Sequence, residues 1–210
     1  MTDRLQAITA AIVAGGASSR FGGIPKGLET VGGRRIIDRV IDAAKAIATE
    51  IVLVSNAEDA ATWVNEVPVV RDVRPERGSL VGIHTALATT NRATLVVAWD
   101  MPFVTAELLS LIVKRAAGER FAVIPESGSG LEPFCALYSA ACLPFVNAAI
   151  DEGDLRVTRL PTRLPSFTQI AEAELKTVGD PATMFFNVNS APELARAEEI
   201  EKAERRSRHR

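Results

Sequence analysis

The sequence is poor in the residue types on which several common kinds of site depend. Its 210 residues include two histidines, His84 and His209, and two cysteines, Cys135 and Cys142. Two cysteines are too few for a disulfide framework, and the chain shows neither the C-x-x-C nor the H-x-x-x-H spacing of a zinc site. A G-x-S-x-G elbow is also absent, which argues against a serine hydrolase. Any chemistry must therefore come from other side chains and from the backbone.

The charge balance and the apolar pattern exclude further classes. The formal net charge is −2, which gives no overall reason to bind nucleic acid or a membrane surface. No apolar run reaches the ~18 residues of a membrane-spanning helix, and Met1 to Gln6 lacks the pattern of a secretory signal. Together with the scarcity of cysteine, these features predict a cytoplasmic protein that binds neither nucleic acid nor a membrane.

What is present is an alternation of short β-branched runs with longer helical patterns, and 47% of the residues are apolar. We expect strands at 7–13, 50–55, 67–71, 94–98 and 121–124, helices at 35–48, 80–89 and 105–117, an added strand at 133–139, and further helices at 141–150 and 191–205. Residues 155–170 are expected to form a loop or short helix near the site. The alternation predicts one α/β domain over 1–197 with a mostly parallel, doubly wound sheet, and a charged tail at 198–210.

A glycine-rich segment follows the first expected strand. From Val13 to Lys26 it reads V-A-G-G-A-S-S-R-F-G-G-I-P-K. Glycine lets a backbone approach an anion closely, and exposed N–H groups in such a loop form a nest for phosphate oxygens. Arg20 and Lys26 add charged donors. The loop is neither a Walker A motif nor a dinucleotide fingerprint. It predicts a nucleoside triphosphate site, and the alternative is a surface turn without a ligand.

Polar residues follow the later strands, at the edge where open α/β sheets bind ligands. The amide of Asn56 could bind a nucleobase or cap a turn. Asp72 could bind a base or ribose, or it could pair with neighbouring arginines on the surface. Asp100 stands in W-D-M-P-F at the exit of a buried strand. Mg²⁺ uses few protein carboxylates and completes its shell with waters and phosphates, so Asp100 is the leading metal ligand; the alternative is a turn former before Pro102.

A pair of amides stands near the C-terminal end, in F-F-N-V-N-S. Asn187 and Asn189 alternate, so both side chains point to one side if the backbone is extended. Such a pair could bind an acceptor substrate or a hydrated metal, or it could belong to a capped helix entry. Ser190, followed by Ala-Pro-Glu, is a favourable start for the last helix.

These segments together resemble a known family. The Val13–Lys26 loop is similar to the first motif of nucleotidyltransferases with a Rossmann-like fold. The segments R-G-S-L-V-G-I-H-T-A-L (Arg77–Leu87), W-D-M-P-F and M-F-F-N-V-N-S-A-P-E-L (Met184–Leu194) extend the resemblance to the molybdenum cofactor guanylyltransferase (MobA-like) family. The motifs span nearly the whole chain. The resemblance implies a single-domain, Rossmann-like, three-layer α/β/α fold.

It also implies a reaction and a set of site residues. The reaction is transfer of GMP from GTP to molybdopterin, with release of pyrophosphate and a requirement for Mg²⁺. The resemblance further implies transient contact with other molybdenum cofactor proteins. The implied residues are Val13, Ala14, Gly15, Gly16, Lys26, Asn56, Asp72 and Asp100 for the nucleotide, Arg20, Lys26 and Asp100 for catalysis, Asp100 for the metal, and Gly82, Asn187 and Asn189 for the acceptor.

Two departures from the family pattern bear on the choice of nucleotide and acceptor. Pro25 precedes Lys26 where such guanylyltransferases usually have aspartate, and proline there is more like sugar-nucleotide and cytidylyl enzymes. Trp99 precedes Asp100 where a small residue or cysteine is common. The alternatives are therefore a cytidylyltransferase or sugar-phosphate nucleotidyltransferase on the same scaffold and, from another class, a nucleotide-binding protein without catalysis.

Overall fold

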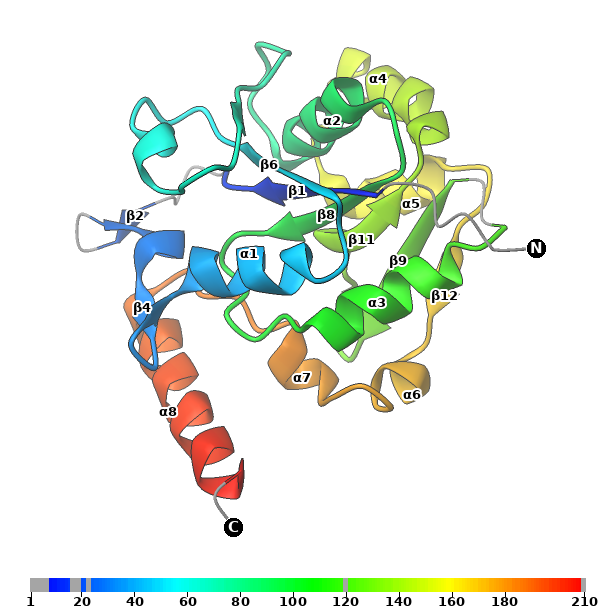
Figure 1. Cartoon of the computed structure of the whole chain (residues 1–210). Helices are drawn as coiled ribbons and strands as arrows, with labels where there is room; N and C mark the ends of the chain where they lie inside the picture. Colours follow the sequence, from blue (N-terminus) through cyan, green and yellow to red (C-terminus); the bar gives the residue numbers. More distant parts are fainter. Residues whose placement is uncertain (1–7, 16–19, 22–23, 119–120, 209–210) are drawn as a thin grey trace.

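The chain folds into three layers, with a central sheet between two sets of helices (Figure 1). A computed structural model describes residues 8–15, 20–21, 24–118 and 121–208, and the side chains of all of these except residues 20, 21, 24 and 208. Among the described residues, eight strands form the main sheet: β1 (Thr9–Val13), β6 (Glu50–Val54), β7 (Val69–Val70), β8 (Thr94–Ala98), β9 (Ala122–Ser127), β10 (Gly130–Leu131), β11 (Cys135–Tyr138) and β12 (Thr168–Ile170).

The strand order is β10-β9-β11-β8-β1-β6-β7, and β12 pairs with β9. Strands β8, β1, β6 and β7 are parallel to one another, whereas β11 runs antiparallel to both β8 and β9. Because β8 and β9 both oppose β11, they point the same way. The carboxyl ends of β1, β6, β7, β8 and β9 therefore lie at one edge of the sheet, which is where a ligand site is expected.

Helices cover both faces of the sheet. They are α1 (Ile36–Lys45), α2 (Ser79–Thr90), α3 (Ala106–Arg115), α4 (Leu143–Asp151), α5 (Leu160–Arg163), α6 (Glu172–Leu175), α7 (Pro181–Met184) and α8 (Ala191–Arg208). One core lies between the sheet and α1 and α3, and the other lies between the sheet and α2, α4 and α5. Figure 1 shows α2 and α4 above the sheet and α1 and α3 below it. Strands buried on both faces explain the continuous apolar runs in the sequence.

Local sequence signals account for two of the main helices, α1 and α3. α1 places Ile36, Ile37, Val40 and Ile41 on its buried face, a spacing typical of a helix that covers a sheet. At the start of α3 the side chain of Thr105 accepts a hydrogen bond from the backbone N–H of Leu108, as an N-cap residue should.

Short elements join the main ones. The hairpins β2 (Arg20–Phe21) with β3 (Ile24–Pro25) and β4 (Thr30–Val31) with β5 (Arg34–Arg35) flank the 3₁₀ turn η1 (Lys26–Leu28). Other 3₁₀ turns are η2 (Ala60–Thr62), η3 (Ala140–Cys142) and η4 (Val157–Arg159). In the described ranges no helix is long and apolar enough to cross a membrane. Cys135 and Cys142 are both buried.

The expected fold class is confirmed. Strands lie within or overlap the expected ranges 7–13, 50–55, 67–71, 94–98 and 121–124, and helices overlap 35–48, 80–89 and 105–117. The range 133–139 contains the antiparallel strand β11. The segment 155–170 holds η4 and α5, as a short-helix interpretation expects, and it ends in β12, which was not expected. Thr168–Ile170 is a three-residue strand, too short to show a period of two in the sequence.

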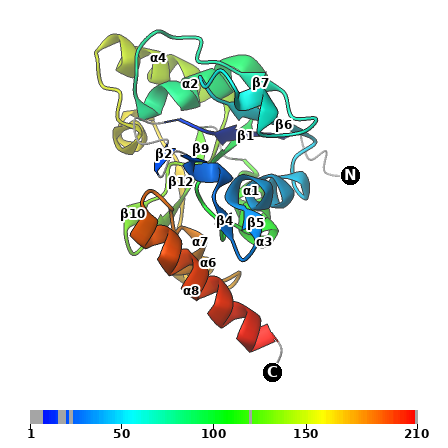
Figure 2. The same cartoon turned by 90° about the vertical axis from the view of Figure 1, so that its left-hand side faces the viewer.

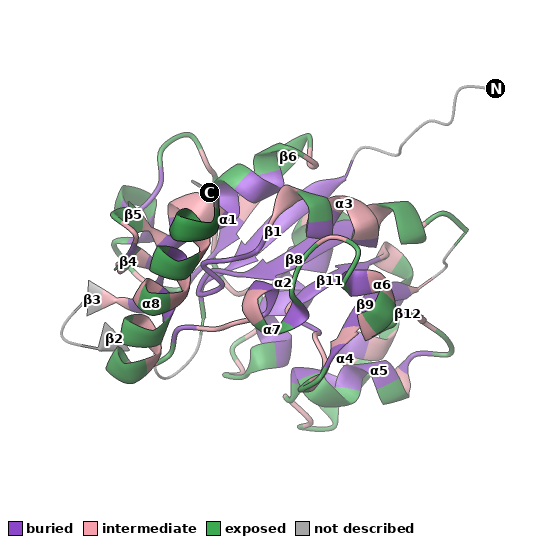
Figure 3. Cartoon of the chain, turned by 90° about the horizontal axis from the view of Figure 1, so that it is seen from below, coloured by how far each residue is buried: buried purple, intermediate pink, exposed green. Residues whose placement is uncertain are grey.

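The C-terminal end differs from the expected charged tail at 198–210. Helix α8 runs without a break through residue 198 and continues to Arg208. Glu201 is 6% exposed, and Ala197 is completely buried. The first part of the expected tail therefore packs against the domain, although most of α8 is exposed and its far end projects from the body (Figures 2 and 3).

Candidate active site

Three segments that are far apart in the sequence meet at the carboxyl edge of the sheet. Asp100 follows β8 by two residues, Lys26 opens η1, and Asn189 precedes α8. The ammonium Nζ of Lys26 donates to Oδ2 of Asp100 at 2.5 Å and to Oδ1 of Asn189 at 2.7 Å. The side chains of Lys26 and Asp100 are 9% and 7% exposed. The structure thus brings together three of the residues that the sequence singled out for separate reasons.

Backbone hydrogen bonds hold these segments in place. The N–H of Trp99 donates to the carbonyl of Val13, which joins the end of β8 to the start of the glycine loop. The N–H of Val188 donates to the carbonyl of Asp100 at 2.9 Å. Glu193, in the first turn of α8, accepts hydrogen bonds from the N–H of Asn189 and the hydroxyl of Ser190. The segment around Asn189 is therefore held both to Asp100, the candidate metal ligand, and to the first turn of α8.

Trp99 has a packing role that accounts for the glycine beside Lys26. A Cβ atom on Gly27 would lie 2.3 Å from Cε3 of Trp99, so only glycine lets η1 approach the indole this closely. On its other side Trp99 stacks on Trp63, with ring centroids 5.2 Å apart and an angle of 19° between the planes. Trp99, the unusual residue before Asp100, thus packs directly against η1, the turn that begins at Lys26.

A second polar cluster follows β6 and β7. Nδ2 of Asn56 donates to Oδ2 of Asp72 at 2.6 Å, and the N–H of Asp72 donates to Oδ1 of Asn56 at 2.9 Å. The hydroxyl of Thr85, on α2, donates to Oδ1 of Asp72 at 3.0 Å. Thr85 was not expected, because a single threonine inside a helical pattern gives no sequence signal.

The alternative of an arginine cluster around Asp72 is not what the described residues show. Arg74 pairs instead with Glu76 and Asp151. His84, on the same helix as Thr85, is buried, and this burial lowers its pKa, against a hydrogen bond with Asn147 that acts to raise it. Its imidazole is therefore neutral at pH 7, and we assign it no role.

The remaining candidates for nucleotide binding and catalysis stand at the end of β1 and in the glycine-rich segment that follows it in the sequence. Val13 and Ala14 are buried at the end of β1, and the N–H of Ala14 donates to the carbonyl of Val54. Gly15 is exposed. Gly16 and the side chain of Arg20 lie outside the described parts of the chain, so their expected roles stay predictions.

Two expected acceptor residues make contacts of their own. Gly82 lies in α2, and a Cβ there would meet Cγ1 of Val13 at 2.7 Å, so this glycine allows the helix to approach β1. Nδ2 of Asn187 donates to the carbonyl of Phe185, whereas Asn189 contacts Lys26. The two asparagines thus engage different partners, although they stand two residues apart.

The described residues offer few protein ligands for a metal ion. Within the described residues no group of three or more His, Cys, Asp or Glu side chains could hold a metal ion. Asp100 is a lone carboxylate, yet its oxygen and the amide oxygen of Asn189 already share one cation, the Lys26 ammonium. Oxygen donors that gather around a cation fit a hard divalent ion whose other ligands are waters and phosphates.

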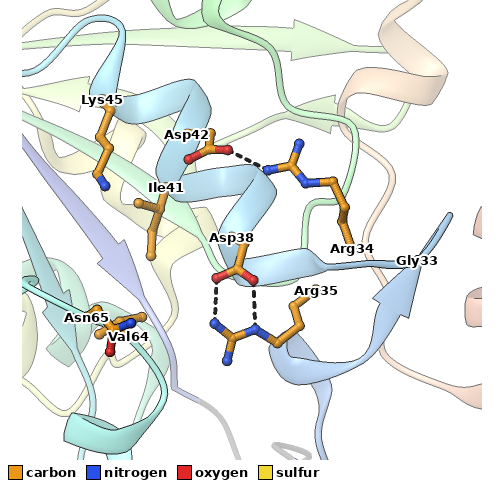
Figure 4. A pocket seen from close by; sticks show the side chains of 9 residues that line it. All are labelled: Gly33, Arg34, Arg35, Asp38, Ile41, Asp42, Lys45, Val64 and Asn65. Atoms are coloured by element: carbon orange, nitrogen blue, oxygen red, sulfur yellow. Dashed lines mark hydrogen bonds and ion pairs between the residues drawn. The ribbon is translucent and has the colours of Figure 1, made fainter.

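A separate hollow of about 450 Å³ lies along α1 and is lined mainly by charged side chains (Figure 4). Its arginines are already paired: Arg34 with Asp42 at 2.5 Å, and Arg35 with both oxygens of Asp38 at 2.7 Å. Their charges are thus largely neutralised within the hollow, which makes it a poor receptor for a triphosphate.

Comparison with known proteins agrees with this geometry. Residues 10–166 match the family described as "MobA-like NTP transferase domain". The molybdenum cofactor guanylyltransferase of Desulfosudis oleivorans is 35% identical over 203 residues, which cover 96% of this chain and 99% of that protein. The probable molybdenum cofactor guanylyltransferase of Pelotomaculum thermopropionicum is 33% identical over 190 residues, with 90% and 91% covered.

A solved structure shows the same fold. The molybdopterin-guanine dinucleotide biosynthesis protein A of Archaeoglobus fulgidus superposes with a TM-score of 0.79 at 27% identity, covering 93% of this chain and 99% of that one. The site at the carboxyl edge, the family match and the full-length relatives agree: the chain belongs to the MobA-like NTP transferase family and is a nucleotidyltransferase of molybdenum cofactor biosynthesis.

Proposed function

We propose that this enzyme transfers GMP from GTP to a phosphate of molybdopterin and releases pyrophosphate, with Mg²⁺ bound at Asp100. The observation that supports this most is the contact of Lys26 with both Asp100 and Asn189. It joins a cation from the nucleotide loop, a carboxylate at the exit of β8 and an amide from the acceptor side in one place. The names of the relatives, molybdenum cofactor guanylyltransferases, support a guanylyl donor and an acceptor that belongs to the molybdenum cofactor.

The chain's own residues have distinct tasks in this reaction. Two polyanions must meet, so positioning and neutralisation of charge are the main requirements. Lys26 would turn from Asp100 to the phosphates and stabilise charge on the departing pyrophosphate, with Arg20 as a second cation. When bound, Mg²⁺ would polarise the α-phosphate. Asp100 would hold this ion, and Asn189 would orient the acceptor.

A general base is not required for the attack. An acceptor phosphate has a second pKa of about 6, so its oxygen is largely ionised at neutral pH. This agrees with the two polar clusters of the candidate site, Lys26–Asp100–Asn189 and Asn56–Asp72–Thr85, neither of which includes a histidine. The Asn56–Asp72–Thr85 cluster lies after β6 and β7, on the opposite side of β1 from β8, and is suited to bind the base or ribose.

A second candidate is a cytidylyl or sugar-phosphate nucleotidyltransferase, which the Pro25-Lys26 sequence favours. Pro25 has φ −60° and ψ 130° and immediately precedes η1, so proline fits the local backbone. The experiment that separates the two is pyrophosphate release with each of the four NTPs, Mg²⁺ and molybdopterin. We expect release with GTP. Release with CTP alone would favour the second candidate, and tight GTP binding without release would point to a non-catalytic protein.

A further inference from the structure

Two arms of the chain leave the site side by side. One begins at Lys26 and continues through η1, β4 and β5 into α1, and the other begins at Asn189 and continues along α8. At the site the arms are joined by the hydrogen bond from Lys26 to Asn189. Figure 2 shows α8 passing the β4–β5 hairpin as it leaves the body.

The arms meet again at the hairpin, far from the site. The N–H of Gly32 donates to Oε1 of Glu198 at 2.9 Å, and Arg205 donates to the carbonyl of Gly32 at 2.6 Å. Glu201 lies between Glu198 and Arg205 on α8, twelve residues after Asn189. At a rise of 1.5 Å per residue, Glu201 is about 15 Å along the helix from Ala191, where α8 begins.

Glu201 is the centre of this second contact. Its Oε2 lies 3.0 Å from a guanidinium nitrogen of Arg39, and its Oε1 accepts a hydrogen bond from Arg205 at 2.7 Å. Arg39 also donates to the carbonyl of Val31 in β4. The side chains of Arg39 and Glu201 are only 15% and 8% exposed. Arg39, on α1, thus ties Glu201 to the same hairpin that Lys26 leads into.

The hairpin is shaped to receive the helix at this point. Gly32 has φ +61°, and a Cβ there would lie 2.6 Å from Cγ of Glu201. A shift of α8 along its axis would separate Glu201 from Arg39 and leave the largely buried guanidinium of Arg39 without its carboxylate, which is unfavourable. The second contact therefore fixes the position of α8 along its axis, and α8 begins two residues after Asn189.

We propose that Glu201 is a positioning residue for the acceptor side of the active site. Through its contacts with Arg39 and the hairpin it fixes α8, and through the first turn of α8 it fixes the amide of Asn189 against Lys26. The inference rests on the proposed function, in which Asn189 orients the acceptor. Misplacement by about 1 Å can cost up to 10²-fold in rate, so a distant anchor of this kind matters for catalysis.

The test compares Glu201→Gln with Glu199→Gln. Glu199 is a matched control on the same helix, because it is exposed and pairs only with the exposed Arg196 among the described residues. We expect Glu201→Gln to raise the KM for molybdopterin about 5-fold or more, while the Kd for GTP stays within about 2-fold. Glu199→Gln should change neither. The side-chain amide resonance of Asn189, read by NMR in the free protein, should shift in Glu201→Gln only.

Arg205→Ala covers the case in which Glu201→Gln does not fold. It removes the outer contacts to Gly32 and Glu201 and leaves the Arg39–Glu201 pair in place, so it should give a smaller change in the same direction. Folded variants with an unchanged acceptor KM and an unchanged Asn189 resonance would overturn the inference. So would an equal loss of GTP and acceptor binding. If the wild type released no pyrophosphate, the proposed function would fail, while the Asn189 resonance would still decide the positioning role.

Discussion

The Lys26–Asp100 pair at the active site and the Arg39–Glu201 pair under α8 are both buried, but they differ in their cations. Lysine offers a compact ammonium on a flexible stem, whereas arginine offers a planar fork with several donors in fixed directions. Arg39 uses this fork to contact Glu201 and a backbone carbonyl together. Lys26 contacts two side chains that a substrate could replace.

The Lys26–Asp100 contact is suited to exchange partners, whereas the Arg39–Glu201 contact is suited to hold α8 in one position. In the proposed reaction a triphosphate and its cation would offer new partners to both Lys26 and Asp100, so the first pair could open without leaving buried charge unpaired. The proposed reaction includes no ligand that would replace Glu201 as the partner of Arg39, and Arg205 adds a second cation on Glu201. We therefore expect changes at the first pair to affect turnover, and changes at the second to affect stability and, through the position of Asn189, the KM for the acceptor.

The largest effect is expected from Asp100→Ala. It removes the carboxylate that would hold the metal, and loss of a key electrostatic stabiliser typically costs about 10²–10³ in kcat. Pyrophosphate release in saturating Mg²⁺ measures this, with thermal unfolding as the check that the variant is folded. Turnover near the wild-type value would reject the metal role of Asp100.

Glu201→Gln should have the next largest effect, on stability. Removing one partner of a buried pair costs about 3 kcal/mol in the free energy of unfolding. Burial acts to raise the pKa of Glu201, but hydrogen bonds and charges from Arg205 and Arg39 outweigh it, so the pKa lies below the ordinary value of 4.5. A carboxyl whose pKa is lowered by folding stabilises the fold above its unfolded pKa and loses this contribution as the pH falls through the folded value.

Urea unfolding of wild type and Glu201→Gln at several pH values tests this directly. The difference between the two should be full at pH 7 and should shrink below about pH 4.5, the ordinary value. Glu199→Gln, at an exposed pair, should stay within about 0.5 kcal/mol of the wild type. A difference that is the same at pH 7 and pH 3.5 would show that the charge of Glu201 is not what stabilises α8.

Lys26→Ala should reduce turnover about 10-fold while the protein stays folded, because one charge-assisted contact to the phosphates is lost. The expected loss is smaller than for Asp100→Ala, since Arg20 is proposed as a second cation. Pyrophosphate release at saturating GTP measures it, and circular dichroism checks the fold. Full activity of a folded variant would contradict the role of Lys26.

The contact between Lys26 and Asp100 was easier to predict from the sequence than the contact between Lys26 and Asn189. Asp100 stands two residues after a strand pattern, and Lys26 ends the glycine-rich loop that follows another. The rule that ligands bind at the carboxyl ends of parallel strands brings both to one edge of the sheet. Asn189 was found as part of a motif, but its bond to Lys26 spans 163 positions and has no local sequence signal. The partners of Asn56 and Asp72 were left open because turns, ion pairs and ligand sites use the same residue types.

The role of α8 was missed for a different reason. The run after residue 197 was expected to form a charged tail, since charged residues are rarely buried without partners. The partners, Arg39 and the turn at Gly32, lie more than 150 positions earlier. A helical spacing of Leu194, Ala197, Glu201 and Arg205 on one face was present in the sequence, but three of these residues would suit an exposed face as well.

The smallest expected effect compares two neighbouring glycines in the hairpin that receives α8. Gly32 and Gly33 have φ +61° and +79°, so alanine at either position costs about 1 kcal/mol for the left-handed backbone alone. A Cβ on Gly33 would meet nothing within 4 Å, whereas one on Gly32 would meet Glu201 and Arg205. Gly32→Ala should therefore cost about 1 kcal/mol more than Gly33→Ala, measured by urea unfolding. Equal losses would mean that α8 does not press on Gly32, and the hairpin could then not transmit the position of Glu201 to Asn189.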